Sequence, residues 1–334
     1  MVMPPSVSVV IPVYNAQSWI RETLESVFRQ TYPSDRIELV VVDDGSRDDS
    51  VVVARRFLAE RSMPGIVSSE KNAGVSAARN RGWKLSTAGW IQFLDADDLL
   101  APAKLELQME FASRQPDDVA VIYSPWQRLR SFNGDWRPSG QLVDHEVDDD
   151  DTVVQILKDG RFGYVGPALV RRSFLERVGG FDESMNLGED YDLMLRIAMS
   201  GGRFRKLPSA EATFLQRETP GSLWQRAGGN ATSIARLARV SRKAEMFLRR
   251  QSANGLPAEA RGALVARYSL GLDLLLEGDF DTFWETNEWI RGLGHEHPPL
   301  TTARLKLVSN LVGYETAQRM RRWYLKAKRL VLPP

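Results

Sequence analysis

The first hundred residues of the chain alternate between short apolar runs and longer helical segments. The runs at 7–11, 37–42, 66–67 and 90–94 are rich in β-branched and other apolar residues, as in buried strands. Segment 17–30 repeats apolar side chains at helical spacing, and 48–61 and 74–86 are also expected to be helical. Because such alternation is typical of parallel βαβ units, we expect an α/β fold with a doubly wound sheet.

The pattern changes after residue 101. A helix is expected at 103–114 and a strand at 119–123, but 126–151 has no clear period. That segment ends in six carboxylates between residues 144 and 151. We interpret the acidic cluster as a solvated surface loop, with a flap over a binding site as the alternative. Beyond residue 230 the chain is expected to be mostly helical, most clearly at 264–276 and 301–330.

The residue types present exclude several kinds of site. The 334 residues include no Cys, which rules out disulfides, zinc–thiolate sites, iron–sulfur clusters and a thiol nucleophile. Only three His are present, so a His-rich metal site or a Ser-His-Asp triad is not expected. The apolar run at 7–13 is too short for a signal peptide, and no stretch approaches the roughly 18 apolar residues of a membrane span. We therefore expect a cytoplasmic protein.

Charge is distributed unevenly, although the net charge is only +1. Residues 225–334 hold 18 Lys and Arg against 10 Asp and Glu, whereas residues 1–224 hold 26 against 33. This asymmetry predicts two domains, 1–224 and 225–334, with Gly228 and Gly229 near the boundary.

The basic run 319–329 has six basic residues, no acidic one, and Trp323 and Tyr324 between them. One interpretation is peripheral contact with anionic lipid at the inner face of the membrane, and the other is a solvated helix face. Nucleic-acid binding is not expected, because residues 1–224, which carry the candidate site described next, are net acidic.

Polar residues follow three of the predicted strands. They occupy 12–15, 43–46 and 95–98, and the carboxyl ends of parallel strands meet at one edge of a sheet, where ligands bind. A turn or a helix cap explains one such Asp-Gly pair, but it explains three polar strand ends less well. The alternate carboxylates of Asp95 and Asp97 are suitable oxygen ligands for Mg²⁺ or Mn²⁺, and such an ion would bridge the phosphates of a nucleotide.

Segment 71–80 runs from a loop into a helix. Lys71 and Arg79 are candidates for phosphate contacts, with Asn72 and the helix N-terminus as further donors. The alternative is that Arg79 pairs with a carboxylate near a strand end.

The ordered motifs at 9–15, 42–48, 72–80 and 93–98 resemble those of the inverting glycosyltransferases of family 2, which have a GT-A fold. Two later segments extend the resemblance: Gly-Gly-Phe-Asp-Glu at 179–183 and Gly-Glu-Asp-Tyr-Asp-Leu at 188–193, which is expected to begin a helix. The resemblance covers residues 6–222. It implies a Rossmann-like mixed sheet flanked by helices, here followed by a helical C-terminal region.

The resemblance also implies a role for each matching residue. Pro12, Tyr14 and Asn15 would line the nucleotide-sugar site, Asp44 would bind the base, and Asp43 would support the pocket.

On the reacting side, Asp95 would lie near the ribose or the metal, and Asp97 would bind the metal directly. Asp190 would be the general base, and Glu189 would position neighbouring groups.

One departure from the family pattern concerns the metal. Family members often carry Arg-x-His-x-x-Ser after the acidic helix, whereas this chain has Arg217 to Ser222 with Thr219 at the His position. A third protein ligand to the metal is therefore in doubt. The aromatic residues Trp126, Trp136, Phe162 and Tyr164 either pack within the protein or stack on an acceptor sugar.

We expect a glycosyltransferase that moves one sugar from a nucleoside-diphosphate sugar, most simply a UDP-sugar, to a glycan, lipid or protein hydroxyl. Inverting transfer is one displacement and needs no covalent nucleophile, which agrees with the residue types present. A glycan-binding or scaffolding module would not need Asp97 and Asp190. A sugar-phosphate nucleotidyltransferase would carry a Gly-rich loop after the first strand, but residues 12–15 have no Gly.

Overall fold

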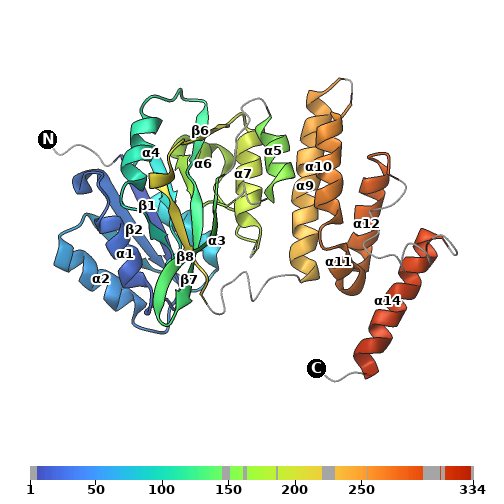
Figure 1. The fold of residues 1–334 in the computed structure, drawn as a ribbon, viewed down its shortest axis with the longest axis horizontal. Helices are drawn as coiled ribbons and strands as arrows, with labels where there is room; N and C mark the ends of the chain where they lie inside the picture. The colour runs from blue at the N-terminus through green and yellow to red at the C-terminus, as the bar shows by residue number, and fades with distance from the viewer. Residues whose placement is uncertain are drawn as a thin grey trace. The chain divides into compact units, whose positions relative to one another are not determined.

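The computed structural model describes residues 6–144, 151–160, 164–185, 187–219, 230–253, 255–295, 309 and 313–331. The chain forms two compact units, Met1–Arg226 and Ala227–Pro334. Figure 1 shows the sheets in the first unit and helices in the second. The two boundary glycines predicted from the sequence, Gly228 and Gly229, lie outside the described residues.

A seven-stranded mixed sheet organises the first unit, in the order β10-β6-β9-β4-β1-β2-β3. Strand β9 runs antiparallel to both of its neighbours, and the other pairs are parallel. The strands are β1 (Val7–Val13), β2 (Ile37–Asp43), β3 (Gly65–Ser69), β4 (Trp90–Phe93), β6 (Val119–Tyr123), β9 (Ala168–Arg171) and β10 (Arg203–Lys206). The predicted α/β class with helices around a mixed sheet is confirmed.

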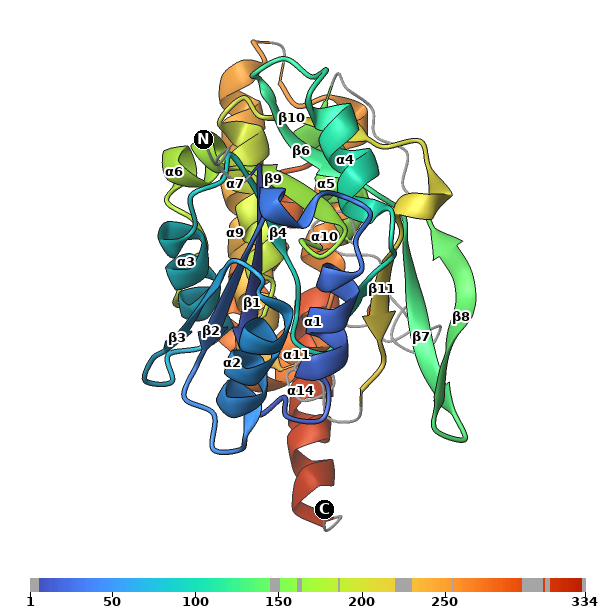
Figure 2. The ribbon, with the colours of Figure 1, turned by 90° about the vertical axis from the view of Figure 1, so that its left-hand side faces the viewer.

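Helices cover both faces of this sheet (Figure 2). Helices α1 (Ile20–Phe28), α2 (Ser50–Arg61) and α4 (Lys104–Ala112) share one hydrophobic core with alternate residues of β1 and β2. The other face carries α3 (Val75–Leu85), α6 (Arg172–Val178) and α7 (Glu189–Met199). A Cβ atom on Gly82 of α3 would lie 2.2 Å from Val10 Cγ1, so glycine is what lets this helix approach β1 so closely.

A second sheet, β5-β11-β7-β8, lies beside the first. Its strands are β5 (Leu99–Leu100), β11 (Phe214–Arg217), β7 (Trp126–Phe132) and β8 (Asp135–Val143). The sequence pattern left 126–151 without a regular element, which is wrong for β7 and β8. The two strands form a hairpin around Asn133 and Gly134, whose φ angles are 53° and 92°, as in a type I′ turn. Residues 145–150 of the acidic cluster lie outside the described residues.

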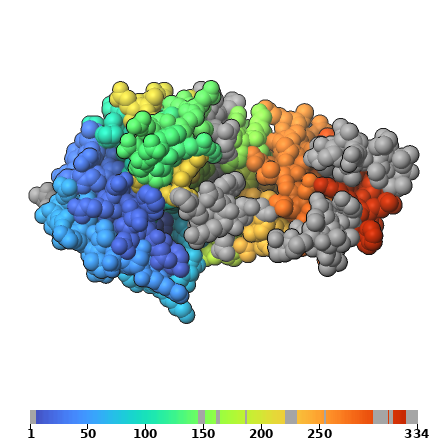
Figure 3. Space-filling model, turned by 60° about the horizontal axis from the view of Figure 1, so that its bottom comes forward, coloured from blue at the N-terminus to red at the C-terminus, as the bar shows by residue number. Residues whose placement is uncertain are grey.

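The remaining short elements of the first unit are helix α5 (Thr152–Lys158) and the 3₁₀ turns η1 (Ser34–Arg36) and η3 (Ala210–Ala212). Figure 3 shows the green atoms of the hairpin exposed beside the blue atoms of the α1 region. Trp19 before α1 and Trp136 of β8 join these two regions, with ring centroids 5.6 Å apart.

The second unit consists of helices in its described part. They are α9 (Ala231–Gln251), α10 (Ala258–Ser269), α11 (Leu272–Gly278), α12 (Phe280–Arg291) and α14 (Tyr314–Val331). The single helix predicted at 264–276 is wrong, because Gly271 separates two helices with φ 70°. Of the segment 301–330, residues 301–308 and 310–312 lie outside the described residues. Among the helices that the structure describes, none is long and apolar enough to cross a bilayer.

Candidate active site

The ends of β1 and β2 are tied together by polar contacts. Asn15 lies two residues after the end of β1 with φ 51°, and its N–H donates to Ser46 Oγ at 2.9 Å. The N–H of Arg47 donates in return to Asn15 Oδ1 at 2.8 Å. Pro12 is buried within β1, whereas Tyr14 is 48% exposed. Asn15, one of the residues predicted to line the nucleotide site, therefore lies against the loop that follows β2.

The carboxylates at the end of β2 organise two loops. Asp43 Oδ1 accepts the N–H of Ser46 at 3.0 Å. The buried Asp44 carboxylate accepts the N–H groups of Ala73 at 2.7 Å and Gly74 at 3.0 Å. Asn72 Nδ2 donates to the carbonyl oxygen of Asp44 at 2.9 Å. Asp44 thus fixes the loop that leads into α3, while Lys71 in that loop is exposed.

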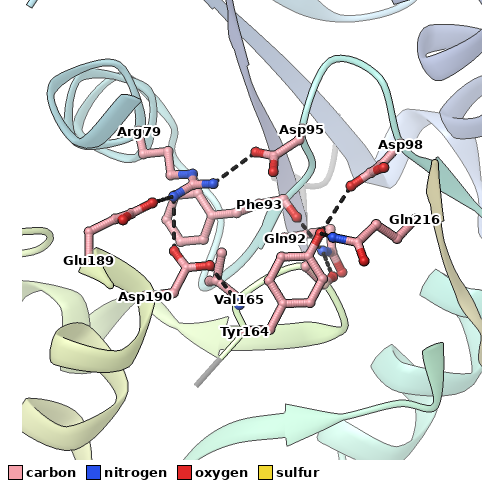
Figure 4. Close-up of polar contacts among 11 residues, drawn as sticks. Arg79, Gln92, Phe93, Asp95, Asp98, Tyr164, Val165, Glu189, Asp190 and Gln216 are labelled. Carbon is pink, nitrogen blue, oxygen red and sulfur yellow. Dashed lines mark hydrogen bonds and ion pairs between the residues drawn. The ribbon is translucent and has the colours of Figure 1, made fainter. Parts of the chain in front are cut away.

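An acidic turn follows β4. The N–H of Asp98 donates to the carbonyl of Asp95 at 3.0 Å, which closes the turn. The buried Asp98 accepts the N–H of Arg217 at 2.8 Å and the hydroxyl of Tyr164 at 3.0 Å (Figure 4). Burial, and then the neighbouring carboxylates of Asp97 and Asp95, raise the pKa of Asp98 well above its usual range. Asp98 therefore joins the turn to β11 and to the segment before β9.

Asp97, within the acidic turn, is hydrogen-bonded to β11 and to the residues that follow it. The hydroxyl of Thr219 donates to Asp97 Oδ2 at 2.8 Å, and Arg217 Nη1 donates to the Asp97 carbonyl at 3.0 Å. Burial and the charge of Asp95 raise the pKa of Asp97. Arg217 also pairs with Glu22, and its guanidinium lies 5.7 Å from the ring centroid of Trp19 and 5.6 Å from that of Trp136.

Arg79 of α3 binds three carboxylates at once (Figure 4). Its Nη2 lies 2.8 Å from Asp95 Oδ1, and its Nη1 lies 2.9 Å from Asp190 Oδ1 and 3.1 Å from Glu189 Oε1. Burial opposes its charge, but the carboxylates of Asp190, Asp95 and Glu189 keep the pKa of Arg79 well above its usual range. Of the two interpretations of Arg79, the structure shows the pairing with carboxylates. A phosphate contact by Arg79 stays a prediction.

Asp190 lies at the start of α7, as predicted for its motif. Burial raises the pKa of Asp190 to about 7. The positive charge of Arg79 opposes this rise, and the negative charges of Glu189 and Asp95 add to it. Its second oxygen, Oδ2, accepts the N–H of Val165 at 3.2 Å. A carboxyl group with a pKa near neutrality is suited to take up a proton from a bound hydroxyl.

The acidic turn offers oxygen ligands for a divalent cation. Arg79 occupies one oxygen of Asp95 and Thr219 occupies one of Asp97, so each carboxylate keeps an oxygen without a hydrogen bond to another described residue. Within the described ranges no group of three or more His, Cys, Asp or Glu forms a metal cage. Two carboxylates fit Mg²⁺ or Mn²⁺ when phosphate oxygens and water complete the shell.

Sequence reasoning missed three residues of this site. No role was predicted for Asp98, Val165 or Gln216. Asp98 accepts the hydroxyl of Tyr164, Val165 donates its N–H to Asp190, and Gln216 Nε2 donates to the Tyr164 hydroxyl at 3.3 Å. For Asp98 the signal was its place directly after Asp97; for Val165 and Gln216 no local signal exists. Trp126 is buried against Tyr164, as expected for packing, and Phe162 and Ser222 lie outside the described residues.

Comparison with known sequences identifies relatives. A family model described as "Glycosyl transferase family 2" matches residues 8–179. The chain is 25% identical, over 67% of its length, to the minor teichoic acid biosynthesis protein GgaB of Bacillus subtilis (strain 168), and covers 24% of it. It is 31% identical, over 62% of its length, to the succinoglycan biosynthesis protein ExoU of Rhizobium meliloti (strain 1021), and covers 60% of it. The chain thus spans less than two thirds of either relative.

Solved structures share the fold. The crystal structure of S. aureus TarS 1–349 in complex with UDP-GlcNAc is 20% identical, with a TM-score of 0.66 over 97% of this chain and 92% of that one. The mannosyltransferase PcManGT from Pyrobaculum calidifontis, in complex with GDP-Man and Mn²⁺, is 19% identical, with a TM-score of 0.56 over 97% and 88%. The expected GT-A architecture is confirmed by this likeness.

Proposed function

Because this chain belongs to glycosyl transferase family 2 and is a glycosyltransferase, we propose that it moves one sugar from a nucleoside-diphosphate sugar to a hydroxyl group of a glycan, lipid or protein. The observation that carries the proposal is the bridge that Arg79 makes between Asp95 and Asp190. It joins a turn suited to a cation and a diphosphate to a carboxyl group suited to a hydroxyl. Transfer is assigned to residues 1–224.

The donor site is proposed at the ends of β1 and β2. Tyr14, Asn15 and Asp44 would contact the nucleoside, and Lys71 and Asn72 would contact phosphate oxygens. The contacts of Asp44 with the loop at 72–74 support this, because they hold both sets of groups at one sheet edge. We propose a UDP-sugar as donor, because TarS is described in complex with UDP and with UDP-GlcNAc. PcManGT is described with GDP-Man, so the choice of base needs a direct test.

Mg²⁺ or Mn²⁺ is the proposed cofactor, held by Asp95 and Asp97. When bound, such an ion stabilises the negative charge that develops on the leaving diphosphate. Thr219 replaces the His of the family pattern and donates to Asp97, so it supports a metal ligand instead of being one.

Asp190 is proposed as the general base of an inverting displacement. Its carboxylate takes the proton of the acceptor hydroxyl while that oxygen bonds to the anomeric carbon. The bond from this carbon to the diphosphate oxygen breaks in the same step, and the nucleoside diphosphate leaves on the opposite face. Glu189 binds Arg79 and thereby helps to hold Asp190 in place.

Helix α14 in residues 225–334 is proposed to contact an anionic membrane through 319–329, where a lipid-linked acceptor would be available. Trp323 is 74% exposed and Met320 55% exposed, one turn apart on a strongly basic helix. Apolar side chains among basic ones are suited to the interface of an anionic bilayer.

Donor hydrolysis and transfer measured with and without Mn²⁺ test the proposal. We expect metal-dependent turnover that Asp190→Asn abolishes and that the matched control Asp117→Asn, on a fully exposed carboxylate, retains. Binding of the donor without turnover would instead favour a glycan-binding module. Thermal melting with a panel of nucleoside-diphosphate sugars identifies the donor, because a ligand that binds the native state raises the melting temperature.

A further inference from the structure

A lysine is buried in the core under the sheet. Lys104, at the start of α4, has no exposed surface, and its Nζ lies 2.6 Å from Gln92 Oε1 and 2.6 Å from Gln108 Oε1. Burial lowers the pKa of Lys104 well below its usual range, with no charge partner among the described residues to oppose this. Such a group reduces stability unless hydrogen bonds compensate, and an apolar residue would fill the space at lower cost.

The two glutamines connect this lysine to the segment before β9. Gln92 Nε2 donates to the carbonyl of Phe93 at 2.6 Å and to the carbonyl of Gly166 at 2.7 Å (Figure 4). Gln108 Nε2 donates to the carbonyl of Ile122 on β6 at 2.9 Å and to the carbonyl of Pro167 at 3.2 Å. Because Lys104 occupies the oxygen of each amide, each Nε2 is directed to a backbone carbonyl. Lys104 therefore sets the orientation of both glutamines.

The segment that these glutamines hold carries two groups of the site. The N–H of Val165 donates to Asp190, and the hydroxyl of Tyr164 donates to Asp98. The segment has little room to move, since a Cβ on Gly166 would lie 2.6 Å from Phe214 Cζ and 2.9 Å from Tyr164 Cζ. A small shift of its carbonyls would thus shift its donors relative to both carboxylates.

We propose that Lys104, Gln92 and Gln108 form a positioning cluster that places the Val165 N–H against Asp190. The part of this inference that concerns transfer rests on Asp190 being the base. The part that concerns placement does not. The nucleoside contacts are assigned to the ends of β1 and β2, so loss of the cluster lowers kcat and leaves the affinity for UDP in the absence of metal unchanged.

Amide hydrogen exchange of the full chain tests placement directly. In Lys104→Met we expect the Val165 amide to exchange at least about tenfold faster than in the wild type, because its hydrogen bond opens more often. The control Phe57→Leu, at a buried residue of α2 that packs against Phe28 of α1, lowers core stability without touching this segment. Val165 should keep its protection in that variant relative to the rest of the chain.

Steady-state kinetics with UDP titration test the consequence. We expect kcat of Lys104→Met to fall about tenfold, because small misplacements of reacting groups slow a reaction by at least this much. The Kd for UDP measured without metal should be unchanged after correction for the folded fraction. Unchanged protection at Val165, or an equal loss in Phe57→Leu, would show that the cluster only fills the core. Faster exchange with an unaltered kcat would equally overturn the link to the reaction.

A second variant covers failure of Lys104→Met to fold. Gln92→Glu gives Lys104 a carboxylate partner but removes the N–H donor to Gly166, so it should fold and still lose protection at Val165. Protection retained there would refute the proposal. If Asp190→Asn keeps full transfer, the proposed base is wrong, while the exchange results still decide placement.

Discussion

Asp95 and Asp190, 95 positions apart in the sequence, are held by the two terminal nitrogens of one guanidinium. Arg79 binds them at 2.8 and 2.9 Å, and its side chain is only 4% exposed. Since one rigid planar group spans both carboxylates, the separation between the acidic turn and α7 is fixed before any ligand binds. The turn and the proposed base are therefore preorganised relative to each other.

Two substitutions of Arg79 distinguish the effect of its positive charge from the effect of its planar shape. Arg79→Met leaves three partly buried carboxylates without a counter-charge, so we expect a loss of about 2–4 kcal/mol in the free energy of unfolding and no transfer. Arg79→Lys keeps the charge but has no planar fork, so we expect a smaller loss of stability and a drop in kcat of about 100-fold. Urea unfolding and initial rates measure both, with the exposed Arg56→Lys as control. Full activity in Arg79→Lys would refute the geometric role.

The pH dependence of the rate reports on Asp190. Only its carboxylate form accepts a proton, so with a pKa of about 7 we expect kcat/KM to rise with pH through neutrality. The midpoint belongs to the whole cluster, because Arg79 couples Asp190 to its neighbours. The charge of Glu189 raises the pKa of Asp190, so Glu189→Gln should move the midpoint to lower pH. A pH–rate profile that shifts upward instead would contradict this assignment.

The strand ends were predictable because local signals determine them. The sequence showed β-branched runs, polar residues directly after them and helices between them. Predicting the site from this pattern required only the rule that the carboxyl ends of parallel strands meet at one edge of a sheet. The hairpin at 126–143 was missed because its strands alternate poorly and their outer residues are exposed. Its signal, Asn133 followed by Gly134, was present but was not used.

The interior of the site could not be predicted, for a different reason. Which carboxylates Arg79 would meet depends on how α3 and α7 pack on the sheet, and no spacing in the sequence encodes that. The Val165 contact involves a backbone N–H, which carries no residue-specific signal at all. The buried Lys104 was read as part of an ordinary helix, since its burial follows from tertiary packing.

Removal of the metal and substitution of Thr219 both test the proposed cation site at Asp95 and Asp97. EDTA should abolish transfer, and Mn²⁺ should restore it. Thr219→Val removes the hydroxyl that donates to Asp97, so we expect the Mn²⁺ concentration for half-maximal rate to rise about tenfold. Thr87→Val, which alters a hydroxyl near Glu38, should leave that concentration unchanged. A rate insensitive to EDTA would refute metal dependence.

Substitutions of Asp44 distinguish its hydrogen bonds to the loop at 72–74 from its proposed contact with the nucleotide base. Asp44→Ala leaves the N–H groups of Ala73 and Gly74 without their acceptor, at about 1–3 kcal/mol for each one that stays buried. We expect a lower melting temperature and UDP binding weakened more than about tenfold, with Asp44→Asn intermediate because its amide keeps one oxygen. Calorimetric titration with UDP measures the affinity. A lowered melting temperature with unchanged UDP affinity would leave Asp44 as a loop anchor only.

Helix α14 should bind vesicles that carry anionic lipid. The basic run supplies attraction that salt weakens, whereas Met320 and Trp323 supply apolar area that salt does not weaken. We expect the intact chain to sediment with vesicles containing phosphatidylserine and not with neutral ones, and binding to decrease at high salt. The double variant Met320→Ala/Trp323→Ala should weaken binding about three- to tenfold, while Met246→Ala, at an exposed methionine of α9, should not. Equal binding to neutral vesicles would refute the electrostatic part, and an unaffected double variant would assign the basic run to a solvated helix face.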